Sequence, residues 1–171
     1  MSDIYTDLAK KAIEGLLIRK ELPQSQNLPI ELLKKRAGCF VSLYNQSNEL
    51  RGCIGTVEPQ HKNLAAEIIY NAIEATRDPR FEPVQTDELD KLSIKVDILS
   101  RPEAIGDEKG LDPKKYGVIV QANTGHIGVL LPDIEGVSTI EAQMTIAKEK
   151  AGLDPDEPVN IYRFTVDRYP N

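Results

Sequence analysis

Two glycines, Gly52 and Gly55, interrupt a stretch that otherwise has the composition of a β-strand, residues 50–56. Glycine weakens a strand, because it loses more backbone entropy on folding than other residues and offers no side chain to pack. The pair therefore predicts that the backbone bends here or that another group approaches it closely. Arg51 and Cys53 alternate with the glycines and add a planar guanidinium donor and a thiol. We predict that the candidate site lies in this stretch.

Hydrophobic periodicity along the rest of the chain predicts a mixed fold. Segments of helical spacing are interspersed with segments of strand spacing or strand composition. The predicted elements are helices over 4–17, 30–36, 64–77 and 139–151, hairpins over 39–56 and 117–131, and strands over 92–98 and 159–166. Strict alternation over 92–98 is typical of a sheet with one buried face. We expect an α+β fold, with an antiparallel or mixed sheet or barrel and flanking helices.

The two hairpins share a pattern that suggests a repeat. Gly-Cys-Ile-Gly at 52–55 and Gly-His-Ile-Gly at 125–128 are each followed four residues later by a proline, then by a helix and a strand. We interpret them as diverged hairpin–helix–strand units about a pseudo-twofold axis, with Cys53 and His126 in matching places. An imidazolium near the thiol would lower its pKa and favour a nucleophilic thiolate. The alternative is that the two patterns agree by chance, because glycine and proline mark the turns of most hairpins. Cys53 would then be a buried structural cysteine and His126 a surface histidine.

Length and composition bound the remaining possibilities. The 171 residues fit a single domain over 1–171, and the charged segment 101–116 offers a joint between two subdomains as the alternative. The net charge of -6 disfavours broad contact with nucleic acid. No apolar stretch approaches the roughly 20 residues that span a bilayer. An acidic N-terminus and two cysteines without secretory context predict a cytoplasmic protein.

The sequence predicts neither a metal site nor a bound cofactor. His61 and His126 are the two histidines, and Cys-x-x-Cys and His-Glu-x-x-His spacings do not occur. Gly52 and Gly55 do not have the spacing of a dinucleotide-binding loop and do not open a helix.

Cys39 and Cys53 lie on the two strands of the first predicted hairpin. A four-residue turn with Tyr44 opposite Glu49 would pair Cys53 with Phe40, so that the two thiols point to opposite faces. A register shifted by one residue would place them face to face. In a reducing cytoplasm we expect no structural disulfide between them.

A second polar motif, Asp78-Pro79-Arg80-Phe81, follows the helix over 64–77. One interpretation is a capping turn held by an Asp78–Arg80 ion pair. The other places Arg80 beside Arg51, so that two guanidinium groups bind one carboxylate or phosphate.

Taken together, the heptapeptide LRGCIGT at 50–56 and several later stretches resemble the AMMECR1 domain family. The matching stretches are 78–81 with Pro83, 88–89, 128–132, 150–153 and 162–164. The resemblance implies an α+β fold of antiparallel strands and flanking helices, with a cleft beside the heptapeptide. It implies a prokaryotic member, component A of the three-part AmmeMemoRadiSam system, with Memo-like and radical-SAM partners. It implies no biochemical activity, and the family pattern does not fix a histidine at position 126.

Two functional hypotheses follow. The preferred one is an accessory binding module whose cleft recognises a small anionic ligand or a partner segment. Its expected ligand-binding residues are Arg51, Gly52, Gly55, Thr56, Asp78 and Arg80. The alternative is an enzyme that uses Cys53 as nucleophile or general acid on a small anionic substrate, with His126 as a weaker catalytic candidate. We expect burial of Cys53 to outweigh the field of Arg51, leaving a protonated, slowly reacting thiol.

Overall fold

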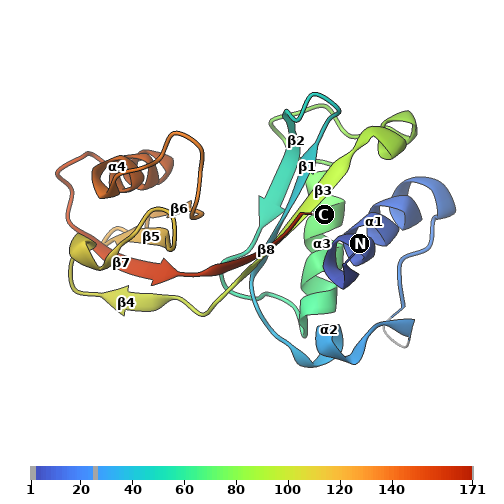
Figure 1. Ribbon diagram of the computed structural model, residues 1–171, viewed down its shortest axis with the longest axis horizontal. Helices are drawn as coiled ribbons and strands as arrows, with labels where there is room; N and C mark the ends of the chain where they lie inside the picture. Colours follow the sequence, from blue (N-terminus) through green and yellow to red (C-terminus); the bar gives the residue numbers. More distant parts are fainter. Residues whose placement is uncertain (1–2, 25–26, 171) are drawn as a thin grey trace. The chain divides into compact units, whose positions relative to one another are not determined.

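The strands form two separate four-stranded sheets in the computed structural model, which describes residues 3–24 and 27–170. The chain divides into two units (Figure 1). Unit 1 comprises the chain up to Leu99 together with the segment from Asp167, and unit 2 comprises Ser100–Val166. The chain therefore crosses between the units twice, and each unit has a sheet and a hydrophobic core of its own.

Unit 1 is a sheet of order β2-β1-β3-β8 with helices on one face. Its elements are α1 (Ile4–Glu14), η1 (Gly15–Arg19), α2 (Ile30–Lys34), β1 (Cys39–Tyr44), β2 (Leu50–Gly55), α3 (Leu64–Ala75), η3 (Thr86–Lys91), β3 (Ser93–Leu99) and β8 (Val166–Pro170). The side chain of Asp3 caps α1, and that of Asn63 caps α3. Helix α3 packs on β1 and β2, and α1 packs on α3 and β3.

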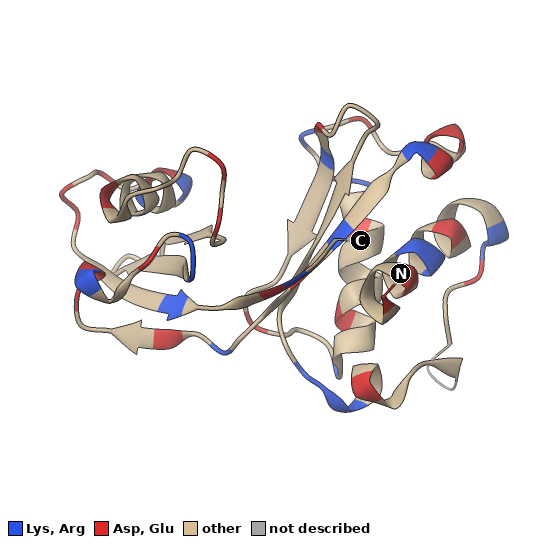
Figure 2. Ribbon diagram, in the orientation of Figure 1, with Lys and Arg blue, Asp and Glu red and all other residues tan. Residues whose placement is uncertain are grey.

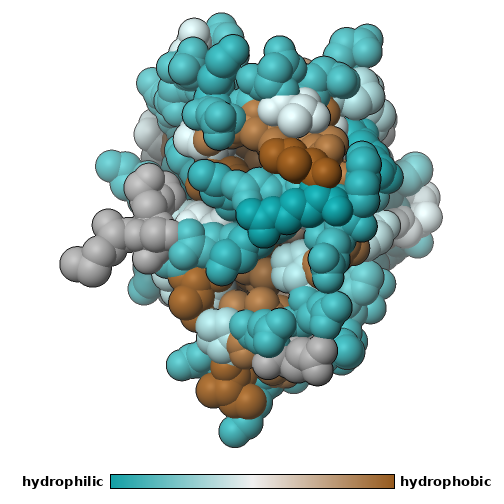
Figure 3. All heavy atoms as spheres, turned by 90° about the vertical axis from the view of Figure 1, so that its right-hand side faces the viewer, coloured by the Kyte–Doolittle hydropathy of each residue, from teal (hydrophilic) through white to brown (hydrophobic). Residues whose placement is uncertain are grey.

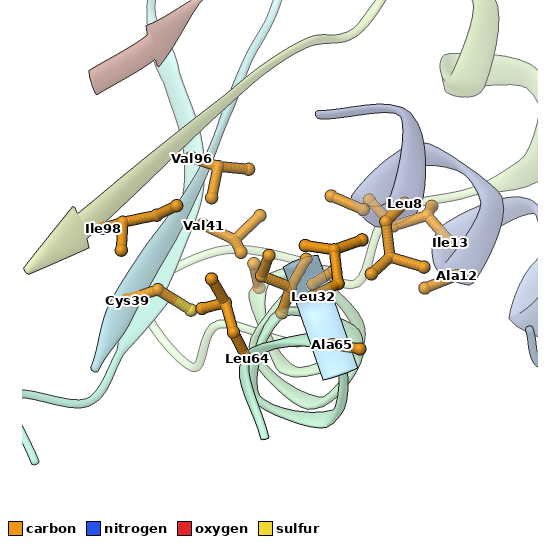
Figure 4. Close-up of a cluster of buried hydrophobic side chains, with 14 of the residues drawn as sticks. Leu8, Ala12, Ile13, Leu32, Cys39, Val41, Leu64, Ala65, Val96 and Ile98 are labelled. Atoms are coloured by element: carbon orange, nitrogen blue, oxygen red, sulfur yellow. The ribbon is translucent and has the colours of Figure 1, made fainter. Parts of the chain in front are cut away.

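Strand alternation decides which face of this sheet meets the helices. Cys39, Val41 and Leu43 of β1 are fully buried and belong to the core. Figure 4 shows Cys39 and Val41 in this cluster. Successive side chains point to opposite faces of a strand, so Ser42 and Tyr44 project from the other side. We call that side the helix-free face.

Unit 2 is a sheet of order β4-β7-β5-β6 with a single long helix packed on it. Its elements are β4 (Glu103–Ile105), η4 (Glu108–Gly110), β5 (Gly117–Ala122), β6 (Ile127–Leu130), α4 (Ile140–Lys150) and β7 (Val159–Phe164). Helix α4 packs against β5 and β6, and Met144 and Ala147 contribute to the core.

The predicted α+β fold with two hairpin–helix–strand units is confirmed. The order β1-β2-α3-β3 recurs as β5-β6-α4-β7, and the strands take the same places in their sheets, β2-β1-β3 and β6-β5-β7. Both sheets are open, so the barrel alternative is wrong. Two strands were not predicted: β4 lies in the charged segment 101–116, and β8 follows the predicted last strand. The side chain of Thr139 caps α4.

The predicted match of Cys53 with His126 is wrong by three residues. A Cβ at Gly52 would overlap the carbonyl oxygen of Ala75 in α3, and a Cβ at Gly128 would overlap that of Ala147 in α4. Gly52 thus corresponds to Gly128, and Cys53 to Val129. The sequence pattern had instead matched Gly52 with Gly125, a turn glycine at φ +90° that faces open space.

Because the helix carbonyl occupies the space that a side chain would need, alanine at either strand glycine should destabilise its unit. We expect Gly52→Ala and Gly128→Ala each to lower the free energy of unfolding by about 1–3 kcal/mol. Urea denaturation monitored by circular dichroism measures the loss. Gly106→Ala is the matched control, because nothing lies within 4 Å of the added methyl group. Equal stability of all three variants would contradict this account of the glycines.

Candidate functional site

Cys53 sits in the middle of β2, one of the two edge strands of unit 1, directly opposite Ser42 of β1. The predicted partner Phe40 pairs with Gly55 instead, because an irregularity between Leu43 and Tyr44 shifts the register. The conclusion drawn from that register still holds. Cys39 is fully buried in the core beneath the helices, whereas Cys53 is half-buried on the helix-free face, and both thiols are free.

The turn after α3 closes the free edge of β2 at Cys53. The backbone N–H of Cys53 donates to Asp78 Oδ2 at 2.9 Å, and its carbonyl accepts from Arg80 Nη2 at 3.3 Å. The guanidinium of Arg80 also donates two hydrogen bonds to the Asp78 carboxylate, of 3.0 and 2.6 Å, and its backbone N–H donates a third, of 3.1 Å. These bonds hold the pKa of Asp78 well below its usual range. The ion pair thus takes the place of a neighbouring strand.

The close approach predicted by the two glycines is made by the protein itself. At Gly52 the approaching group is the last turn of α3, and at Gly55 it is the ring of Phe40. Both glycines therefore shape the hairpin, and their space is filled from within unit 1.

Arg51 is held by the segment that follows the Asp78 turn. Its guanidinium donates to both carboxylate oxygens of Glu88, at 2.7 and 2.9 Å, and to the carbonyl of Glu82 at 2.7 Å. Hydrogen bonds from Arg51 lower the pKa of Glu88. Each arginine of the predicted anion site thus already has a carboxylate partner.

Thr56 fixes the loop that follows β2. Its hydroxyl donates to the carboxylate of Glu67, a fully buried residue of α3. The other oxygen of Glu67 accepts from the backbone N–H groups of Gln60 and His61, at 2.9 and 2.8 Å. A buried carboxylate needs such donors, so Thr56 and Glu67 position residues 56–61.

Sequence reasoning missed a row of polar side chains on the helix-free face. Cys53, Ser42 and Lys95 are directly opposite one another on β2, β1 and β3, and we call them the polar row. Ser42 Oγ donates to Cys53 Sγ at 3.2 Å. Lys95 Nζ lies 4.6 Å from the centre of the Tyr44 ring. The alternation over 92–98 signalled that Lys95 faces away from the core, but only the register places it beside Ser42.

Charged residues continue the polar row toward β8. Asp97 is buried on β3, two residues from Lys95, and accepts from Arg168 of β8 at 2.7 Å. Figure 2 shows acidic and basic residues side by side on these strands. The helix-free face of unit 1 therefore carries an ion pair and polar side chains beside the ring of Phe40.

Burial dominates the acid–base chemistry of this face. It raises the pKa of the Cys53 thiol, and the Ser42 hydrogen bond and the charge of Arg80 oppose it only in part. Burial likewise raises the pKa of Tyr44, with Cys53 and Asp97 adding to the effect. The pKa of Cys39 rises to about 12. Cys53 is therefore a protonated thiol at neutral pH.

His126 lies in unit 2, whereas Cys53 lies in unit 1. It is exposed in the turn before β6, with its Nδ1 3.2 Å from the hydroxyl of Thr124. Within residues 3–24 and 27–170, no group of three or more His, Cys, Asp or Glu side chains could hold a metal ion. None of the helices in that same part of the chain has the length and hydrophobicity to cross a membrane.

An apolar groove lies apart from the polar row, between α1 and the segment leading into β3. Its lining residues are Lys10, Ile13, Glu14, Leu89, Leu92 and Ile94. The right-hand side of Figure 1, seen in Figure 3, shows apolar patches separated by polar side chains. The groove brings no nucleophile or hydrogen-bonding cluster together, so we place the candidate site on the helix-free face.

Comparisons with known proteins agree with this architecture. The sequence model of the AMMECR1 family matches residues 6–169. A protein of Thermotoga maritima is 53% identical over 168 residues, covering 96% of each chain. A crystal structure of an uncharacterised protein from Pyrococcus horikoshii has a TM-score of 0.85 and 32% identity, covering 97% of this chain and 91% of that one.

A relative from Clostridium acetobutylicum differs in length. It is 45% identical over 172 residues, which is 98% of this chain but only 36% of that protein. In that protein the matching segment is therefore joined to a larger amount of other sequence.

The low pKa of Asp78 predicts a specific dependence of stability on pH. A carboxylate with a depressed folded-state pKa stabilises the protein above its unfolded pKa, about 3.9, and loses that contribution as the pH falls further. We expect Asp78→Asn to lose about 1–3 kcal/mol at pH 7 and markedly less at pH 2, because folded Asp78 is protonated only well below the unfolded pKa. Urea midpoints at the two pH values measure this, with exposed Asp90→Asn as control. A deficit of the same size at both pH values would show that charge is not involved.

The raised pKa of Cys53 predicts slow alkylation. With iodoacetamide we expect little modification of Cys53 at pH 7 and a rate that inflects above pH 9, the ordinary thiol value. Ser42→Ala should move the inflection further up, because Ser42 donates to the sulfur; exposed Ser93→Ala should not. Peptide mapping by mass spectrometry separates Cys53 from buried Cys39. An inflection below neutrality would instead favour a catalytic thiol.

Proposed function

The chain belongs to the AMMECR1 family, and on that premise we propose that it is an accessory binding module that acts through the helix-free face of unit 1. One observation carries the proposal: the charged side chains in and around the heptapeptide already have partners within the protein, and its thiol is partly buried. Arg51 is bound by Glu88, Asp78 is bound by Arg80, and burial raises the pKa of Cys53. Such a region presents a fixed polar surface rather than an activated nucleophile.

We propose that this surface recognises a small anionic ligand or an acidic partner segment. The charged residues on or beside it are Arg80, Lys95 and Arg168 against Asp78 and Asp97. Gly52, Gly55 and Thr56 contribute by fixing the hairpin and its following loop, and Arg51 by anchoring residues 82–88. In this proposal they are positioning residues of the binding surface.

We further propose that the module works with Memo-like and radical-SAM proteins in the cytoplasm, as component A of a three-part system. In the Clostridium acetobutylicum relative the matching segment makes up 36% of a longer protein, so the domain occurs there joined to further sequence. Two free cysteines suit a reducing compartment.

The enzyme alternative rests on a single specific observation. The Ser42 hydroxyl and the Arg80 guanidinium both favour the thiolate of Cys53, and a small anionic substrate would meet that thiolate on the helix-free face. The raised pKa of the thiol argues against this alternative, and we rank it second.

Association with purified partners tests the preferred proposal. We expect the full chain to bind a Memo-like or a radical-SAM protein from the same organism, as measured by isothermal titration calorimetry. Tyr44→Ala should weaken that binding by about 30-fold or more, the effect of removing an aromatic anchor. Tyr70→Ala, which alters an exposed tyrosine on the helical side, is the matched control. No association with either protein, or a loss caused only by Tyr70→Ala, would contradict the proposal.

A further inference from the structure

The cation of the polar row differs from the two arginines that the sequence singled out. Arg51 and Arg80 are each bound to a carboxylate, and Arg168 is bound to Asp97. For Lys95, by contrast, no carboxylate lies within 4.0 Å in the part of the chain that the structure describes. Lys95 therefore carries a positive charge on a strand in the interior of the sheet with no counter-charge in contact.

The position of that charge is set by two contacts between neighbouring strands. Lys95 is directly opposite Ser42, and its ammonium lies over the ring of Tyr44, 4.6 Å from the centre. Both residues belong to β1, the strand between β3 and β2. The ammonium of Lys95 thus lies over a residue of β1, the strand between β3 and the strand that carries Cys53. A cation held by an aromatic face keeps its N–H donors available for a further acceptor.

We propose that Lys95, positioned by Tyr44, is the anchor for the anionic group of a ligand on the helix-free face, and that it holds a carboxylate or phosphate beside the thiol of Cys53. This inference rests on the proposed function and deepens it, because it transfers the anion contact from Arg51 and Arg80 to Lys95. The hydroxyl of Ser42, which lies on the strand between Cys53 and Lys95, donates to the sulfur and orients it.

The geometry favours a short ligand. Cys53 and Lys95 are two strands apart, a backbone separation of roughly 10 Å, and the ammonium of Lys95 lies over Tyr44 of the strand between them. A small carboxylate bound to the ammonium would bring its next carbon atoms over Ser42 and toward Cys53. A longer anion would extend past the edge strand β2.

Two alkylating reagents of the same size test the inference directly. Iodoacetate carries a carboxylate and iodoacetamide is its neutral counterpart; in both, the thiolate sulfur forms a bond to carbon and iodide leaves. The ratio of their rates at Cys53 cancels the fraction of thiolate, so it reports only attraction of the anion. We expect this ratio, measured at pH 9, to be about fivefold higher in the folded protein than in the chain unfolded in urea.

Variants at Lys95 test whether this residue causes the higher ratio of alkylation rates. Lys95→Gln should reduce the ratio to that of the unfolded chain, Lys95→Arg should retain it, and added inorganic phosphate should reduce it in a saturable way. Lys10→Gln, on exposed α1 and away from the polar row, should leave it unchanged. Circular dichroism confirms that each variant is folded. A wild-type ratio equal to that of the unfolded chain, or one that persists in Lys95→Gln, would overturn the inference.

The outcome is separable from that of the partner experiment. If the rate ratio behaves as expected but neither partner protein binds, the anion anchor stands and the accessory role fails. If a partner binds through Tyr44 while the ratio of alkylation rates is the same in the folded and the unfolded chain, the accessory role stands and Lys95 is not an anion anchor.

Discussion

The hydrogen bonds that Asp78 and Arg80 make to the backbone of Cys53 are the constraint on which the candidate site depends. An edge strand leaves alternate N–H and C=O groups without partners, and unit 1 satisfies both groups of Cys53 with one ion pair. The same turn leads into the segment that binds Arg51. Without it, the strand carrying the thiol would have a free edge, and the polar row would lose its fixed end.

In both units the helix packs on the hairpin through the same kind of contact. A glycine in the second hairpin strand lets the carbonyl of a helical alanine approach, Ala75 at Gly52 and Ala147 at Gly128. The residue after each glycine also has its carbonyl bound by a cation, Arg80 at Cys53 and Lys150 at Val129. The shared architecture therefore lies in the backbone and its contacts, while the side chains at the matching positions, a thiol and an isopropyl group, have diverged.

The sequence was sufficient for most of the elements, with β4 and β8 as exceptions, and insufficient for the registers. Helical and strand periodicity predicted the α+β fold, both hairpins and the repeated order of elements. The spacing of apolar residues within one segment is enough to indicate whether that segment forms a helix or a strand with a buried face. It could not tell that Gly125 is a turn glycine and Gly128 a strand glycine, since both residues look alike until a helix packs on one of them. Lys95 escaped notice for a related reason. Its neighbours Ser42 and Tyr44 lie about 50 positions earlier, and only strand pairing brings them together.

Unit 1 is discontinuous along the chain, and this has a consequence for its formation during synthesis. The carboxylate of Asp97 is buried on β3, yet its partner Arg168 follows 71 residues later, after the whole of unit 2. A nascent chain that has emerged only as far as Leu99 holds a three-stranded sheet with an uncompensated carboxylate at its growing edge. Tyr5 of α1 likewise lacks the ring of Tyr169 that stacks on it. Translation of unit 2 thus delays completion of the polar face, and an early-folding N-terminal half would acquire its final strand last.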